Sequence, residues 1–193
     1  MSFFNNISKD FRKLRGNSEK ILCIPAVTLL VFSIINSFSF AFSQEYELKA
    51  AFLFNFAKFT EWPEKSFSNE SNICIGVLGE DPFGSAIDSL SGKIVKGKKV
   101  EVIRYSNVED IRECHILFVS DSEKKNLKHI LGHIKNKNML TVSDIKKFCD
   151  YGGMINLVTV DNKIGFEINL ASSKLAGLNI SSQLLKLAKR VIE

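Results

Sequence analysis

The spacing of apolar residues changes along the chain in a way that predicts alternating strands and helices. The segment 123–136 repeats apolar residues at helical spacing, and Ser122 stands where an N-cap is expected. A shorter helix is expected over 85–92. Four other segments are short apolar or alternating runs between polar turns, which is the pattern of strands. They are residues 73–79, 99–105, 115–120 and 138–143.

The C-terminal part of the chain changes to the pattern of an antiparallel pair. Residues 154–160 and 163–170 are strand-like runs joined by Asp161-Asn162, which predicts a hairpin. Two helical pieces follow, separated near Gly177. In the second piece one face is apolar, with Ile180, Leu184, Leu187, Ala188 and Val191. We therefore expect an α/β fold, a three-layer sandwich with a mostly parallel mixed sheet, a C-terminal antiparallel hairpin and flanking helices.

An aromatic stretch, AFLFNFAKFTEWP, occupies residues 51–63. Residues 45–60 contain no proline or glycine, so a helix is expected to run up to Trp62-Pro63. Helical spacing places several rings on one side and Phe54 nearly opposite them. A helix that is apolar almost all round needs cover on more than one side. Either the C-terminal helices or a partner would supply this cover. The candidate partner surface is Phe54, Lys58 and Trp62.

Residues 1–43 have the layout of a secretory signal peptide. Residues 1–20 hold five basic and two acidic residues, and residues 21–38 are uncharged and largely apolar. Ala41-Phe42-Ser43 then provides small residues at the −3 and −1 positions of a cleavage site. The apolar run could also span a membrane, so a retained N-terminal anchor is the alternative. Cleavage would leave residues 44–193 as one exported domain with room for a core.

The charge of the chain gives little support to nucleic-acid binding. The whole chain has a net charge of +5, but the predicted leader holds five basic and two acidic residues, so its removal leaves +2. The lysines that remain in clusters, such as Lys96, Lys98 and Lys99, are typical of a solvated face. We therefore expect no nucleic-acid partner.

No group of residues predicts catalysis. Polar residues follow the first, third and fourth strands, as in phospho-acceptor receiver domains, but the lysine that such a site needs after the fifth strand is missing. These residues are Glu80-Asp81, Asp121 and Ser143. His129 and His133 are one helical turn apart, yet Ile130 stands where a zinc protease has its glutamate. We expect a protein that is not an enzyme and has no metal or cofactor.

Three cysteines lie beyond the predicted leader, and export would bring them into an oxidising compartment. Cys74 begins the first strand and Cys114 immediately precedes the third, and these strands are usually neighbours in a doubly wound sheet. A disulfide between them is favoured over two buried free thiols. It would close a loop of about 40 residues and stabilise the fold by roughly 4 kcal/mol. Cys149 is left over, either as a buried thiol or as an interchain partner.

Several separate motifs, in order, resemble the YfiR family of periplasmic proteins. The resemblance covers roughly residues 46–190. The motifs are KAAFLFNFAKFTEWP, ICIGVLGEDPFG, ILFVSDSE, LTVSDIKKF, YGGMINLV and GFEINLASSKLAGLNISSQLLKLAK. The resemblance implies that Cys74 and Cys114 match a family disulfide pair. A second pair in some members brackets the glycine-glycine turn, but here Cys149 stands before Gly152-Gly153 and no cysteine follows it.

The resemblance implies a regulatory function. The best-understood members repress an inner-membrane diguanylate cyclase by acting on its periplasmic sensor domain, and an outer-membrane lipoprotein sequesters them. Members are also known as homodimers and are linked to redox conditions. We therefore expect a periplasmic, non-enzymatic protein that lowers cyclic di-GMP and so restrains biofilm formation. The alternative is a small-ligand sensor without a cyclase partner, with its site near Glu80-Asp81, Ser120-Asp121 and Ser143.

Overall fold

The structure, a computed structural model, describes residues 44–67, 72–111, 114–135, 137–160 and 163–193, which belong to one compact unit. The predicted signal peptide lies outside the described residues, and so does the predicted turn at Asp161-Asn162. Within the described part of the chain, no helix is long and apolar enough to cross a membrane.

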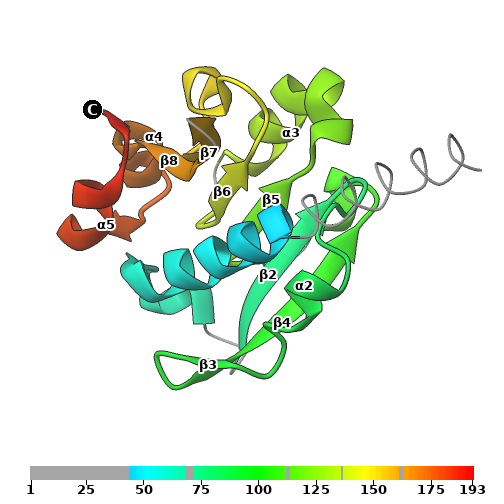
Figure 1. Ribbon diagram of the computed structural model, residues 1–193. Helices are drawn as coiled ribbons and strands as arrows, with labels where there is room; N and C mark the ends of the chain where they lie inside the picture. The colour runs from blue at the N-terminus through cyan, green and yellow to red at the C-terminus, as the bar shows by residue number, and fades with distance from the viewer. Residues whose placement is uncertain (1–43, 68–71, 112–113, 136, 161–162) are drawn as a thin grey trace, which may run out of the picture. The chain divides into compact units, whose positions relative to one another are not determined.

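An eight-stranded mixed sheet forms the centre of this unit (Figure 1). Five neighbouring strands run parallel in the order β4, β2, β5, β6 and β7. The predicted hairpin is confirmed as β7 and β8, while β10 pairs parallel with β8 at one edge and β3 pairs antiparallel with β4 at the other. The strands are β2 (Asn72–Leu78), β3 (Ile94–Val95), β4 (Lys98–Tyr105), β5 (Ile116–Val119), β6 (Leu140–Ser143), β7 (Ile155–Val160), β8 (Lys163–Asn169) and β10 (Arg190–Ile192).

Two hydrophobic cores cover the two faces of this sheet, which confirms the three-layer sandwich. On β2, Ile73 and Ile75 belong to one core and Cys74 and Leu78 to the other, because successive side chains of a strand point to opposite faces. The first face is covered by the helix at residues 44–59 and by α2 (Ser85–Asp88), α4 (Leu170–Leu175) and α5 (Ser182–Leu187). The second face is covered by α3 (Leu127–Ile134) and the 3-10 helices η2 (Val108–Asp110) and η4 (Phe148–Tyr151).

The aromatic helix is covered by the protein's own C-terminal part. The ring centroid of Phe166 in β8 lies 5.7 Å from that of Phe52 and 5.2 Å from that of Phe56, both in edge-on contacts. Directly after the helix, β1 (Thr60–Glu61) pairs antiparallel with β9 (Asn179–Ile180). The C-terminal elements therefore hold both the body and the end of this helix.

Two helix predictions are wrong in detail. Ser122 is not the cap of a helix at 123–136, because η3 (Asp121–Asn126) is a 3-10 segment and α3 begins only at Leu127. The C-terminal helix ends at Leu187, which is 68% exposed. The next residues become extended because the open edge of β8 accepts them: the Lys189 amide donates to the Phe166 carbonyl at 2.8 Å, and Val191 lies in β10.

Candidate functional site

The predicted cysteine pair lies where β2 and β5 run side by side. Cys74 is in β2 and Cys114 shortly precedes β5, and both are buried. The Cys114 thiol donates to the Ile116 carbonyl at 2.9 Å and lies 3.7 Å from the Cys74 carbonyl oxygen. Burial, together with the neighbouring Cys74 thiol, raises the pKa of Cys114 well above its ordinary value. No disulfide joins these two residues in the described part of the chain, so the bridge stays a prediction.

Gly76 in β2 leaves the space that the cysteine pair needs. A Cβ at this position would lie 2.9 Å from Cys114 Sγ and 2.8 Å from Cε2 of Tyr105, closer than such atoms normally approach. The Tyr105 hydroxyl is 4.0 Å from Cys74 Sγ. Burial and then the two nearby thiols raise the pKa of Tyr105 above its ordinary value, so its hydroxyl is neutral. The thiols are therefore enclosed in a tightly packed, uncharged environment.

His115 connects the cysteine pair to the end of the aromatic helix. It is buried, and its Nδ1 accepts a hydrogen bond from the Cys74 amide at 3.1 Å. Its Nε2 lies 3.1 Å from the Ser66 carbonyl, so this network assigns the proton to Nε2. Its carbonyl accepts from Nε1 of Trp62 at 3.1 Å. Sequence reasoning missed His115, although a histidine at the start of an otherwise apolar strand is a signal for such a buried contact.

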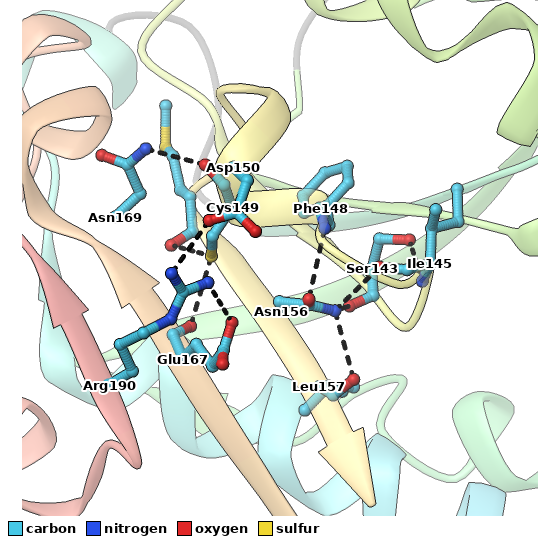
Figure 2. Close-up of polar contacts among 11 residues, drawn as sticks. Ser143, Ile145, Phe148, Cys149, Asp150, Asn156, Leu157, Glu167, Asn169 and Arg190 are labelled. Carbon is cyan, nitrogen blue, oxygen red and sulfur yellow. Dashed lines mark hydrogen bonds and ion pairs between the residues drawn. The ribbon is translucent and has the colours of Figure 1, made fainter.

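Asn156 holds the segment between β6 and β7 in place. It is 1% exposed, and its side-chain amide donates to the carbonyls of Ser143, Ile145 and Leu157 at 3.0–3.2 Å. Its side-chain oxygen accepts from the Phe148 amide at 3.2 Å, as Figure 2 shows. One side chain thus satisfies four backbone groups, which fixes where η4 lies. This residue was also missed, and the signal was a lone amide inside the apolar run of β7.

Cys149 also lies in η4, next to a cluster of charged residues from η4, β8 and β10 (Figure 2). Arg190 in β10 donates to Asp150 at 2.9 Å and to Glu167 at 2.7 Å. The Cys149 thiol is buried, 3.6 Å from the carbonyls of Met154 and Glu167. Burial and then the Glu167 carboxylate raise the pKa of Cys149 to about 12. Cys149 is therefore a neutral thiol at physiological pH and a poor nucleophile.

A pocket of about 760 Å³ lies beyond the end of β6 and alongside β7, and is lined by residues from the start of the aromatic helix and from this cluster. Lys49 is 4% exposed, and its ammonium contacts Asp144 at 2.6 Å and Glu45 at 2.7 Å. The Tyr46 hydroxyl also donates to Asp144, at 2.9 Å. Burial and then Asp144 raise the pKa of Tyr46 to about 12. The walls thus carry charges of both signs that are mostly paired with each other.

The crevice expected from the strand order is filled by the protein itself. In a doubly wound sheet a ligand would bind between the ends of β2 and β5. Here the Ser122 hydroxyl accepts from the Glu80 amide at 3.0 Å, and a Cβ on Gly79 would collide with it. Asp81 is paired with Arg104 at 2.8 Å. The predicted ligand site near Glu80-Asp81 and Asp121 is therefore closed between the ends of β2 and β5.

The other polar residues named for that site are used structurally. The Ser143 hydroxyl is buried and donates to the Val119 carbonyl at 2.7 Å. Asp121 lines the 760 Å³ pocket instead.

His129 and His133 are both exposed on α3, and among the described residues no three potential ligands gather as a metal site.

The three residues of the candidate partner surface differ in their exposure to solvent. Trp62 is only 8% exposed, because its ring packs against His115 and Phe67, so it does not present a surface. Phe54 remains partly exposed, with the Lys58 ammonium 4.6 Å and the Lys93 ammonium 5.4 Å from its ring centroid. Phe54 and Lys58 therefore remain together on one outer face of the helix.

The described residues thus form a doubly wound α/β domain in which several buried polar side chains bind backbone groups. The chain belongs to the YfiR/HmsC-like family, whose model matches residues 46–189. The family is one of periplasmic regulatory proteins in cyclic di-GMP signalling.

Comparison with solved structures gives only distant matches. The ABC domain in complex with L-Trp from Streptococcus pneumoniae matches with 13% identity and a TM-score of 0.46, over 62% of this chain and 55% of that one. A conserved domain protein from Vibrio cholerae matches with 10% identity and a TM-score of 0.44, over 61% of this chain and 54% of that one. This chain thus spans about half the length of these two proteins. No curated protein matches it.

Proposed function

We propose that this protein is a periplasmic, non-enzymatic regulator that binds the periplasmic sensor domain of an inner-membrane diguanylate cyclase and represses it, so that cyclic di-GMP falls. The observation that carries the proposal is the family match over residues 46–189. The mechanism needs no chemistry, because a soluble repressor only has to bind the inactive sensor conformation more tightly than the active one.

The structure supports a binding role through its outer face at Phe54. This ring is partly exposed, and its inner side packs against the core that holds the helix in place. Lys58 and Lys93 lie over the ring, so the face combines an aromatic group with positive charge. Aromatic residues are enriched at interface hot spots. An acidic or neutral patch on the sensor domain would complement this face.

The experiment is a deletion of the gene followed by measurement of cellular cyclic di-GMP. The level is expected to rise on deletion and to return when the wild-type gene is restored. A Phe54→Glu/Lys58→Glu variant is expected to accumulate normally in the periplasm but to restore repression poorly. A Lys163→Glu variant is the control, because Lys163 is exposed on β8 and lies outside this face. An unchanged level on deletion, in cells shown to express an inner-membrane diguanylate cyclase with a periplasmic sensor domain, would contradict the proposal.

Further partners follow from the family rather than from the described contacts. We propose a homodimer and sequestration by an outer-membrane lipoprotein that releases the cyclase. Sedimentation of the purified protein tests the first, and capture of the purified lipoprotein by the immobilised protein tests the second. A monomer at micromolar concentration would contradict the dimer.

A small-ligand sensor is the second candidate, and the 760 Å³ pocket favours it. Its volume is in the range of ligand sites. Its mixed charges would suit a zwitterionic metabolite rather than an apolar one. A thermal-shift screen against amino acids and other periplasmic metabolites tests this, because a ligand that binds only the folded state raises the apparent stability. If no metabolite changes the Tm of the protein, the small-ligand sensor hypothesis is excluded.

A further inference from the structure

A second, larger cavity of about 1010 Å³ lies on the other side of η4, between α3 and α4. We call it the lysine-rimmed groove. Its apolar lining residues come from three separate parts of the chain. They include Leu131 and Ile134 of α3, Ile145, Tyr151 and Met154 around η4, and Leu175 of α4. The groove is thus a distinct surface from the Phe54 face.

Two large apolar side chains on the groove are strongly exposed. Leu175 is 83% exposed and Tyr151 is 64% exposed, whereas Ile134 and Ile145 deeper in the groove are buried. Exposed apolar residues that adjoin an apolar cavity are typical of an interaction site rather than of scattered surface. Covering them would remove apolar area from water with little rearrangement of the buried wall.

The charge around the groove has one sign. Every charged residue that lines it is a lysine, and no carboxylate does so. These residues are Lys124, Lys125, Lys128, Lys135 and Lys146. None of these ammonium groups has an ion pair or hydrogen bond to another described residue. By contrast, Lys49, Arg104 and Arg190 each contact two carboxylates. The groove therefore carries uncompensated positive charge, which attracts an acidic partner.

The arrangement of the lysines distinguishes between two kinds of acidic partner. From Lys124 to Lys135 the chain follows η3 and α3, so these lysines extend over about 17 Å at the usual rise of 3-10 and α-helices. An amphiphile with one charged head group would need positive charge at one end of its site. A row of this length instead matches several carboxylates spaced along a peptide.

We propose that the lysine-rimmed groove docks an acidic amphipathic segment of a partner protein. The apolar side chains of this segment would enter between Leu131 and Leu175, and its carboxylates would face the lysines of η3 and α3. This mode corresponds to the binding of an amphipathic helix in a hydrophobic groove. The proposal goes beyond the proposed function and does not rest on it, because it concerns a different face and names no cyclase.

The test is selection of random peptides displayed on phage against the immobilised purified protein. Peptides rich in Asp or Glu, with apolar residues at three- and four-residue spacing, are expected to be enriched. Synthetic copies labelled with fluorescein then give Kd by anisotropy. Binding is expected to weaken at least tenfold in Lys125→Glu/Lys128→Glu and in Leu175→Asp, and to weaken as salt is raised.

Matched variants serve as controls outside the groove. Lys99→Glu/Lys186→Glu has the same change in net charge, and Leu187→Asp places the same substitution at another exposed leucine. Both are expected to bind as the wild type does. The proposal is overturned if the enriched peptides show no acidic bias or if none is enriched. It is also overturned if the groove variants bind as well as their controls, or if dodecanoate occupies the groove and no peptide does.

Discussion

Replacing Lys49 by methionine tests whether the buried ion pair holds the aromatic helix to the end of β6. The Lys49 side chain is 5% exposed and that of its partner Asp144 is 14% exposed. Removing one member of a buried pair leaves an uncompensated charge, which costs about 3–5 kcal/mol. The Tyr46 hydroxyl still donates to Asp144, so the lower end of that range, about 3 kcal/mol, is expected.

The measurement is urea unfolding followed by circular dichroism, with all variants compared at pH 7. Lys49→Met/Asp144→Leu replaces the pair by apolar groups and is expected to recover most of the lost stability. Lys174→Met, at an exposed lysine, is expected to stay within about 0.5 kcal/mol of the wild type. A loss below about 1 kcal/mol for Lys49→Met, with no recovery in the double variant, would refute the reasoning.

The same cluster predicts a loss of stability in alkali. Burial lowers the pKa of Lys49, but the hydrogen bonds to Asp144 and Glu45 outweigh it and raise the pKa above its ordinary value of 10.5. The pKa of Tyr46 is raised from 10.0 to about 12. Both pKa values are higher in the folded state, so the stabilisation is complete below about pH 10 and is lost as pH rises toward 12 and above. Unfolding of wild type and Tyr46→Phe across this range measures the effect, and equal slopes would contradict it.

Three further outcomes are expected. Gly76→Ala should destabilise the fold by about 1–3 kcal/mol through overpacking against the cysteine pair. Gly132→Ala, in α3 with open space around it, should be neutral or stabilising by up to about 1 kcal/mol. The urea unfolding midpoints of the two variants are compared, and equal effects would contradict the packing argument. Thiol counting on denatured, periplasmic protein should find Cys74 and Cys114 oxidised and one free thiol, and three free thiols would exclude the disulfide. Cys149 should resist alkylation in the folded protein at pH 8, since its pKa is about 12, and rapid labelling detected by mass spectrometry would contradict this.

The central sheet could be predicted from sequence because its strands are buried on both faces. In β2 and β5 nearly every residue is apolar, and such a run has few other stable arrangements. The edges could not be predicted in this way. Val191 continues the helical apolar spacing that begins at Ile180. Residues 190–192 nevertheless form β10, because the edge of β8 offers hydrogen bonds that a helix end lacks. Pairing over two or three residues is decided by the neighbouring strand and not by local pattern.

The candidate site was predicted less completely for a related reason. The nearness of Cys74 and Cys114 followed from strand order alone. The roles of Asn156 and His115 depend on which backbone groups lie around them, and these come from segments distant in sequence. Trp62 was placed on the candidate partner surface because aromatic residues are enriched at interface hot spots. It is buried because β1 pairs with β9, and so folds this segment back onto the core.

The position of Trp62 gives the protein an intrinsic optical probe. It is the only tryptophan of the chain, and its indole is hydrogen bonded to the backbone of His115, the residue after Cys114. Its ring centroid is 5.9 Å from the imidazole of His115, and indole emission is sensitive to such a neighbour. If Cys74 and Cys114 form the predicted disulfide, we expect its formation and reduction to move the backbone at His115, because His115 directly follows Cys114. The fluorescence of the unlabelled protein should therefore report its redox state in real time, without any engineered dye.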